Sequence, residues 1–422
     1  MQRHESELDV LGKKPLMKVL MLGWELPPKI TGGLGVACQG LLEGLSLQPD
    51  VSLWFVLPRL HGDERVSRAR LLAVRDLSPM PSFEEGRNDT SILTDRSQAG
   101  SYQQESLRGV FEYADGMDAV MRKVGSVDLI HAHDWLTYPA ALQIKRLRGC
   151  PMIVHVHSTE HERAGDRANP TIKDIERRGL SEADRVFAVS FRTRQILVEK
   201  YAVAPEKVEV IHNAADHQPW RSVGETQSTG VVSFIGRVAW QKGPSHFIEA
   251  AHKLSHRFPD LRFVMAGEGD RLAMMKAQAM ARGIADRVDF PGFLDTVGVQ
   301  ELLMRTAVYV MPSLSEPFGI GALEAVHCGV PVVLSKACGV SELVKHVTQV
   351  ATGDSTALAE AVAQLLTCPG EAKRQAALAQ KDVRGWSWLK AAEEVLATYR
   401  SVLEPLAGVQ RRTVGIGPLS IS

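Results

Sequence analysis

The chain has 422 residues, 45% hydrophobic and 23% charged, which is typical of a globular protein with two domains. Its 49 basic and 49 acidic residues cancel, so its net charge does not favour nucleic acid or anionic membrane as the main partner. The five cysteines lack CxxC spacing, which favours reduced thiols. No apolar run has transmembrane length, and the polar start MQRHESELDVLGKK is not typical of a signal peptide. We therefore expect a cytoplasmic protein without a transmembrane segment.

The first half of the chain alternates apolar strands with helices. The predicted elements are strands at 17–22, 51–57, 128–132, 184–190 and 208–211, a helix near 110–124 and another ending at Tyr201. Residues 59–105 are polar and irregular, so we interpret them either as an acceptor-facing flap or as a disordered insert.

A glycine-rich turn follows the first strand. In GWELPPKITGGLG, Pro27 and Pro28 exclude a helix, whereas Gly32, Gly33 and Gly35 open one. A strand that leads through glycines into a helix is typical of diphosphate sites, because the backbone N–H groups stay accessible. The motif is not GxGxxG, and a tight strand-to-helix connection explains it equally well.

Histidines follow two neighbouring apolar strands. HAHDW places His131, His133 and Asp134 at one strand end, and HVHSTEHER brings a second set after the next strand: His155, His157, Glu160 and His161. Ligands of open α/β sheets bind at this edge. A zinc site is one interpretation, with His157 and His161 four residues apart, but HExxH and CxxC are absent. A neutral His157 that donates to a sugar hydroxyl or to the backbone is the favoured interpretation.

The second half repeats the strand–helix pattern, with a strand at 231–236, a helix at 244–258 and further pairs up to 335. Such alternation predicts parallel sheets covered by helices on both faces. We therefore predict two Rossmann-like domains. The predicted boundaries are a flexible N-terminus at 1–15, domains at 16–215 and 216–385, a helix at 386–404 that packs back across the junction, and a tail at 405–422.

Two cations, Arg237 and Lys242, follow the first strand of the second half and precede a predicted helix start at Gly243. Positive side chains at a helix N-terminus oppose its dipole unless an anion lies between them. A diphosphate suits this position, because arginine forms a forked contact and lysine supplies a point charge. The alternative is a pair of ordinary surface cations.

Residues 311–335 carry two acids around a predicted anion site. A strand ends near Met311, a loop holds Glu316, and a helix over 319–328 holds Glu324. The loop contains Gly319, Ile320 and Gly321, so N–H groups at the helix start remain open to a phosphate. Carboxylates beside it can accept hydrogen bonds from sugar hydroxyls. A well-capped helix with two solvated acids is the alternative.

Taken together, these motifs resemble those of retaining GT-B glycosyltransferases of family 4, in the branch that resembles glycogen and starch synthases. The matches occur in order along 16–403: PPKITGGLG, HAHDW, HVHSTE, GRVAWQKG and the pair Glu316 and Glu324 with seven residues between. The glycine loop departs from the synthase pattern K-x-G-G-L, because two residues separate Lys29 from Gly32.

The resemblance implies a GT-B fold, with two Rossmann-like domains facing across a cleft. It implies that Arg237 and Lys242 bind the donor diphosphate and stabilise it as it leaves. His157 and Glu316 would contact the donor sugar, and Glu324 the ribose. The remaining implied donor contacts are Gly32, Gly33, Gly319, Ile320 and Gly321. Possible cleft positions are Lys29, His133, Asp134, Asn213, Gly267 and Phe293.

The expected activity is transfer of a hexose, with retention and without a metal or other cofactor, from a nucleotide diphosphate sugar to a glycan. The hexose would be glucose and the acceptor an α-glucan, or alternatively a precursor of a cell-surface polysaccharide. Two other classes remain open. One is a metal-dependent hydrolase that uses His131, His133, His155 and His157, and the other is a non-catalytic sugar-nucleotide binding protein.

Overall fold

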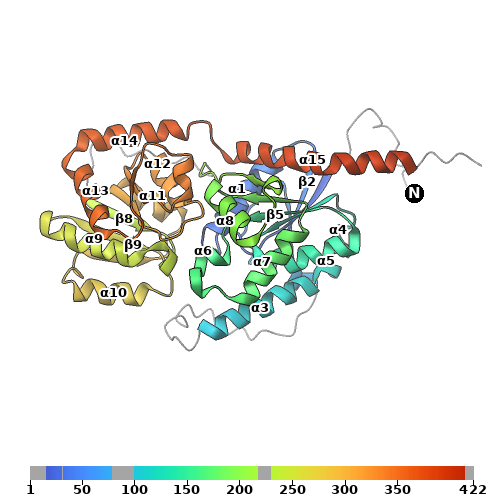
Figure 1. The fold of residues 1–422 in the computed structure, drawn as a ribbon, viewed down its shortest axis with the longest axis horizontal. Helices are drawn as coiled ribbons and strands as arrows, with labels where there is room; N and C mark the ends of the chain where they lie inside the picture. The colour runs from blue at the N-terminus through green and yellow to red at the C-terminus, as the bar shows by residue number, and fades with distance from the viewer. Residues whose placement is uncertain (1–15, 31, 78–98, 217–229, 414–422) are drawn as a thin grey trace, which may run out of the picture.

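The computed structural model describes residues 16–30, 32–77, 99–216 and 230–413. Two parallel sheets, each covered by helices, form two lobes that lie end to end (Figure 1). This arrangement confirms the predicted architecture of two Rossmann-like units.

The N-terminal sheet has seven parallel strands in the order β3-β2-β1-β4-β5-β6-β7. Its strands are apolar and mostly buried, as expected of a sheet covered on both faces. Their bounds are β1 Met17–Leu22, β2 Val51–Leu57, β3 Arg70–Ala73, β4 Leu129–His133, β5 Met152–Val156, β6 Arg185–Ala188 and β7 Val208–Val210.

The C-terminal sheet repeats this winding with six parallel strands in the order β10-β9-β8-β11-β12-β13. Their bounds are β8 Val231–Ile235, β9 Arg262–Ala266, β10 Val288–Gly292, β11 Thr306–Met311, β12 Val332–Ser335 and β13 Thr348–Val350. In both sheets the chain reverses its direction of winding beside the first strand, at β1/β4 and at β8/β11.

The α-helices of the N-terminal half are α1 Gly33–Ser46, α2 Val74–Leu77, α3 Ala99–Asp115, α4 Met117–Val124, α5 Tyr138–Arg148, α6 Glu160–Ala164, α7 Pro170–Glu182 and α8 Phe191–Tyr201. Those of the C-terminal half are α9 Pro244–Arg257, α10 Leu272–Ala281, α11 Thr296–Met304, α12 Ile320–His327, α13 Ser355–Thr367 and α14 Pro369–Asp382. The 3-10 helices are η2 Trp135–Thr137, η3 Gly165–Arg167, η4 Pro205–Lys207, η5 Trp240–Lys242 and η6 Gly339–Glu342.

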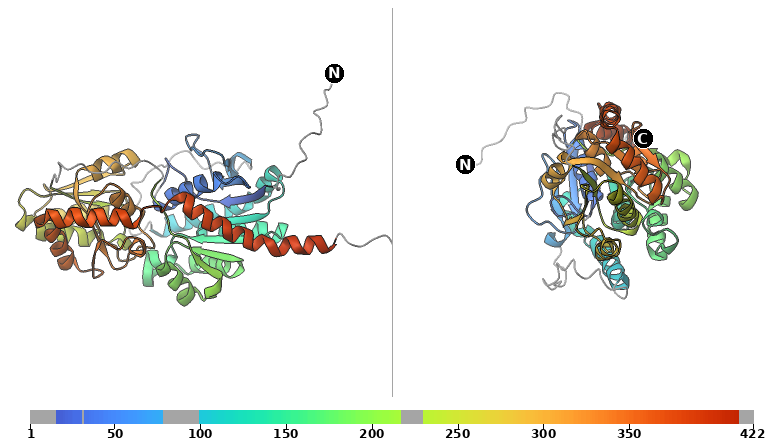
Figure 2. Two further views of the ribbon diagram at one scale, coloured as in Figure 1. Left: turned by 90° about the horizontal axis from the view of Figure 1, so that it is seen from above. Right: turned by 90° about the vertical axis from the view of Figure 1, so that its left-hand side faces the viewer.

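The last helix, α15 Trp388–Thr413, returns to the N-terminal half and lies along α1 (Figure 2). Glycines allow the two helices to approach closely, because a Cβ atom at Gly40 would lie 2.1 Å from the Trp388 ring. Farther along α15, buried Ala391, Val395 and Tyr399 pack into the same cluster as the α1 side chains. The helix extends past residue 404, where the sequence predicts its end.

Two predicted elements differ from the structure. The segment 59–105 is not irregular throughout, because Arg70–Ala73 pairs with β2 as an edge strand and α3 begins at Ala99. Residues 78–98, the centre of the predicted flap or insert, lie outside the described residues. The helix predicted at 110–124 is two helices that meet at Gly116, where a Cβ atom would lie 2.0 Å from Val74.

Candidate active site

Four loops follow the strands at the two points where the sheets reverse their winding, and these loops carry the predicted motifs. In the N-terminal half they are the glycine loop after β1 and the HDW segment after β4. In the C-terminal half they are the RVAWQK segment after β8 and the Glu316 loop after β11. Ligands of doubly wound sheets bind at such points, so the topology itself selects these loops.

Two helix N-termini from opposite halves meet at the centre of this region. A Cβ atom placed on Gly33, the first residue of α1, would lie 3.9 Å from Ile320, the first residue of α12. The cap residues Gly32 and Gly319 have no side chains to cap these helices, and in α1 the Gly35 N–H donates to the Glu25 carboxylate at 3.2 Å. The positive ends of two helices therefore lie close together, and the first-turn N–H groups that have no partner favour an anion there.

The Lys242 ammonium lies against the Glu316 carboxylate, with Nζ 2.8 Å from Oε1 and 2.7 Å from Oε2. Ser313 donates its hydroxyl to Oε2 at 3.1 Å, so the carboxylate is fixed from both sides. The Glu316 side chain is only 6% exposed, whereas that of Lys242 is 22% exposed. Lys242 is therefore the more accessible group of the pair, and Glu316 orients its ammonium.

Arg237 lies at the end of β8 and is exposed. No ion pair joins it to any residue in the described part of the chain, so its charge is available to an anion. Backbone hydrogen bonds fix the neighbouring loops. The Gly236 N–H donates to the Ala266 carbonyl oxygen at 3.0 Å, and the Gly267 N–H donates to the Gly292 carbonyl oxygen at 2.7 Å. A Cβ atom at Gly267 would lie 1.9 Å from the Gly236 carbonyl oxygen, so only glycine fits. Phe293 follows with 49% of its surface exposed.

Glu324 lies on α12, one turn inside the helix, and is partly exposed. Burial raises the pKa of its carboxyl to about 7. A carboxyl with this pKa exchanges its proton near neutral pH, and its charged form gains when hydroxyl groups donate to it. The two glutamates thus differ in their surroundings: Glu316 is paired with Lys242, whereas Glu324 has no lysine partner among the described residues.

His157 lies at the end of β5 and belongs to a buried stack of four imidazoles. His133 Nδ1 lies 3.0 Å from His157 Nε2, and the rings of His155 and His157 are stacked with their centroids 4.5 Å apart. His131 Nδ1 lies 2.5 Å from the Tyr399 hydroxyl of α15. Burial lowers the pKa of His157 to about 3, so its ring is neutral at physiological pH.

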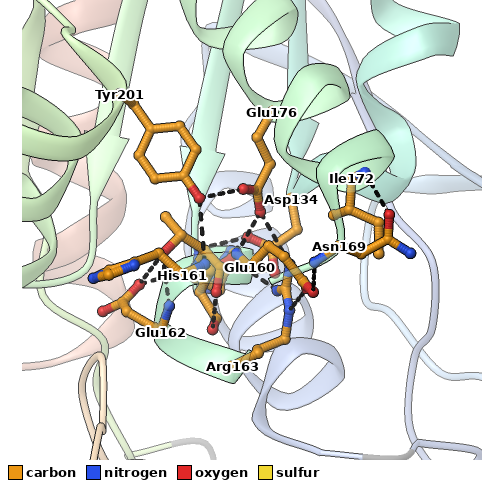
Figure 3. Close-up of polar contacts among 12 residues, drawn as sticks. Asp134, Glu160, His161, Glu162, Arg163, Asn169, Ile172, Glu176 and Tyr201 are labelled. Carbon is orange, nitrogen blue, oxygen red and sulfur yellow. Dashed lines mark hydrogen bonds and ion pairs between the residues drawn. The ribbon is translucent and has the colours of Figure 1, made fainter. Parts of the chain in front are cut away.

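A dense polar network fixes the loop that carries His157 (Figure 3). Asp134 accepts hydrogen bonds from the backbone N–H groups of His157 at 2.7 Å and Ser158 at 3.3 Å. It adopts φ 56°, which turns its side chain beneath this loop. Asp134 and His133 are both buried, so they support the cleft from behind and do not line it.

Arg163 is the cation of this network. Its guanidinium donates to the Ser158 carbonyl oxygen at 2.9 Å, to Glu160 at 3.3 Å and to Glu176 at 3.0 Å (Figure 3). Glu176 also accepts from the Tyr201 hydroxyl and from the Glu160 backbone N–H. Burial raises the pKa of Glu176 to about 7 even though Arg163 opposes that shift. The loop is therefore held by a nearly complete set of buried polar contacts.

Comparison with known proteins identifies the family. The model of Glycosyltransferase Family 4 matches residues 81–219, and that of Glycosyl transferases group 1 matches residues 220–382. A D-inositol 3-phosphate glycosyltransferase of Kribbella flavida is 30% identical over 68% of this chain and 74% of that protein. This chain belongs to the family 4 glycosyltransferases.

Other relatives of this glycosyltransferase align over most of its length. An uncharacterized glycosyltransferase of Methanocaldococcus jannaschii is 29% identical over 92% of this chain and 99% of its own. A glycogen synthase of Mycobacterium tuberculosis is 26% identical over 91% and 94%, in agreement with the predicted synthase-like branch.

Two solved structures show the same GT-B fold. Sucrose-phosphate synthase of Thermosynechococcus elongatus superposes with a TM-score of 0.75 at 18% identity, covering 92% of this chain and 99% of that one. The Anabaena protein HepE in complex with UDP-glucose gives 0.67 at 17% identity, covering 91% and 100%.

Several buried residues of the glycosyltransferase have no signal in the sequence motifs. Arg163, Glu176 and Tyr201 come from α6, α7 and α8, and only the fold brings them together. Asn213, a predicted cleft residue, lies buried where the chain leaves the N-terminal half, and its carbonyl oxygen accepts from the Trp386 indole at 3.0 Å. Lys29 pairs locally with Leu26 in the loop before α1.

The imidazole stack also bears on the proposed metal site. Two groups of three residues in the described part of the chain bring possible ligand atoms within 4.8 Å of one another. They are Cys38, His133 and His157, and His131, His133 and His155. His157 precedes α6, whereas His161 lies on it, so the predicted helical zinc pair does not form. The described cysteines are unpaired thiols, and none of the helices in the described ranges is long and apolar enough to cross a bilayer.

Proposed function

We propose that this glycosyltransferase moves a hexose, with retention of configuration, from a nucleotide diphosphate sugar to a glycan. The observation that carries the proposal is the approach of two helix N-termini at Gly33 and Ile320, with Arg237 and Lys242 in the segment that follows β8 of the C-terminal sheet. A diphosphate supplies the negative charge that this arrangement lacks.

The proposed mechanism relies on charge stabilisation and positioning. As the bond from the sugar C1 to the diphosphate oxygen breaks, Arg237, Lys242 and the α12 N–H groups stabilise the leaving group. The acceptor hydroxyl oxygen attacks C1 from the same face, and a leaving phosphate oxygen takes its proton. Glu316 holds Lys242 and contacts the sugar hydroxyls, neutral His157 contacts the sugar from the other half, and Glu324 binds the ribose. We propose that no metal is required.

The glucose donor and α-glucan acceptor are supported by likeness to proteins named for related chemistry. Relatives include a glycogen synthase, and the structural neighbour HepE is complexed with UDP-glucose. A precursor of a cell-surface polysaccharide is the alternative acceptor. The hydrolase alternative is less well supported, because His131, His133 and His155 are at most 2% exposed and a substrate cannot reach them.

A donor panel tests the proposal. Purified protein is incubated with UDP-, ADP- and GDP-hexoses, with and without maltooligosaccharides, and released nucleoside diphosphate is measured in the presence of EDTA. Release from one donor that glucan stimulates and EDTA leaves unchanged is the expected result. Slow release that is indifferent to glucan would retain the transferase with another acceptor. Donor binding without turnover would identify a binding protein, and EDTA-sensitive hydrolysis would overturn the assignment.

A further inference from the structure

The N-terminus of α8 is capped by residues from both halves of the molecule. Ser190, the cap residue, accepts from the Thr193 backbone N–H at 3.0 Å. The two preceding N–H groups, of Phe191 and Arg192, donate to Glu342 of the C-terminal half at 2.7 and 3.0 Å. The first N–H groups of any helix lack partners within the helix. Here the carboxylate of η6 provides those partners across the domain junction.

A third hydrogen bond completes this junction. His212 Nε2 lies 2.9 Å from Glu342 Oε2, and the two side chains are 13% and 20% exposed. Burial alone would raise the pKa of Glu342, but hydrogen bonds from His212, Phe191 and Arg192 lower it, so the carboxylate is charged at neutral pH. Hydrogen bonds to a charged acceptor at a helix N-terminus are among the stronger ones in proteins.

The same segment of backbone is hydrogen-bonded to the loop that carries Glu316. Gly339 donates to the Glu316 carbonyl oxygen at 3.0 Å, and Val340 donates to Phe318 at 2.8 Å. Across the junction, a Cβ atom at Gly339 would lie 2.8 Å from the Ser190 Cβ, so the Gly339 backbone lies directly against the Ser190 side chain. A continuous set of contacts therefore runs from α8 through η6 to Glu316.

We propose that Glu342 is a positioning residue for glycosyl transfer, which sets the Glu316 loop of one half against the His157 loop of the other. This inference rests on the proposed function. Sugar contacts supplied from two domains are productive only at a defined separation, and a shift of about 1 Å can cost roughly 100-fold in rate. Glu342 itself touches no reacting atom, so its role is exerted through η6 and the Glu316 loop.

The test compares Glu342→Ala and Glu342→Gln with Glu360→Ala. Glu360 lies in an exposed ion pair on α13 with 72% of its side chain exposed, so it controls for the loss of a surface charge. For each variant kcat, the donor KM, the Kd of the free nucleoside diphosphate and the melting temperature are measured. In the proposed function the donor-binding side chains Arg237, Lys242 and Glu324 all belong to the C-terminal half, so the nucleotide Kd reports whether that half remains intact.

We expect Glu342→Ala to lower kcat by 10- to 100-fold while the nucleotide Kd changes less than threefold. Glu342→Gln should lower kcat less than Glu342→Ala does, because its carbonyl oxygen can still accept on one side. Glu360→Ala should resemble the wild type. Hydrogen exchange at the Phe191 and Arg192 amides should accelerate in Glu342→Ala and not in the control.

Two results would overturn the positioning role: a kcat within twofold of the wild type, or a loss of nucleotide affinity as large as the loss of kcat. The latter would mean that the substitution damages the C-terminal half as a whole. If the wild-type protein turns over no donor, the proposed function fails first, and the positioning role falls with it. The two failures are thus distinguished by the wild-type assay.

Discussion

The two halves share one winding of the chain, yet the loops at their facing edges are built in opposite ways. In the N-terminal half, the loop after β5 is held by Asp134, Arg163 and Glu176, whose charges are largely satisfied within the protein. In the C-terminal half, Arg237 is exposed and α12 begins without a side-chain cap. The charged side chains of the β5 loop are paired within the protein, although five nitrogens of the imidazole stack have no hydrogen-bond partner in the described part of the chain. Arg237, by contrast, has no ion pair among the described residues.

This difference suggests a division of labour. A neutral imidazole on a rigid loop can contact a sugar without perturbing the charge of the leaving group. Positive groups without an internal partner are suited to a diphosphate, because the ligand provides the negative charge that the fold leaves out. The predictions below challenge this contrast, starting with the largest expected effect.

Substituting Lys242 or Glu316 in the C-terminal half should have the greatest effect on transfer. We expect Lys242→Ala and Glu316→Ala each to lower kcat/KM by roughly 100- to 1,000-fold, because a preorganised charge contact of this kind contributes about 3–4 kcal/mol. The melting temperature of Lys242→Ala should also fall, because the buried Glu316 carboxylate loses its cation. Steady-state kinetics checks this, with Lys253→Ala on α9 as the control for loss of an exposed lysine. Near-normal transfer by either variant would contradict the proposed site.

Removing the His157 side chain of the N-terminal half should have a smaller effect on transfer and should not change the shape of its pH profile. His157→Ala should lower kcat by roughly 10- to 100-fold, in the range of one lost transition-state hydrogen bond. Because the pKa of His157 is lowered to about 3, the ring stays neutral from pH 5 to 8. The pH profiles of wild type and variant should therefore have the same shape. A wild-type inflection near pH 6 that the substitution removes would contradict the neutral role.

Breaking the support of the N-terminal loop should reduce stability more than chemistry. Arg163→Met leaves the buried carboxylates of Glu160 and Glu176 without their cation, which costs about 3–5 kcal/mol for a buried pair. Thermal unfolding should shift down by several degrees, and kcat should fall by roughly tenfold. Arg177→Met on α7, whose ion pair is exposed, is the matched control. Equal melting temperatures for the two variants would contradict the structural role of Arg163.

The smallest effect concerns the pH dependence of stability at Glu324. Its pKa is raised from 4.5 to about 7 by burial, so the folded protein holds a proton that the unfolded chain releases between these values. This contribution to stability is therefore present below pH 4.5 and is lost as the pH rises through 7. Glu324→Gln should raise the melting temperature by roughly 2–4 °C at pH 8 and hardly at pH 4.5. The same gain at both values would contradict the shifted pKa.

The sequence predicted the parts of this molecule that depend on local pattern. Apolar strands, glycine turns and the order of the motifs indicated both sheets and the family. It missed the edge strand at 70–73, because short polar-flanked strands gain their pairing from β2 and not from their own composition. It also gave no sign of the contact between Glu342 and α8, since partners 151 positions apart are joined only by the fold. The assigned roles at the site remain predictions.

The packing of α15 against α1 affects how the chain folds during its translation. One face of α1 is covered in part by Trp388 and Ala392, which leave the ribosome after the whole second sheet. At roughly 5–20 residues per second, that face waits on the order of ten seconds or more for its cover. A nascent chain stopped before Trp388 would leave this apolar surface exposed to solvent.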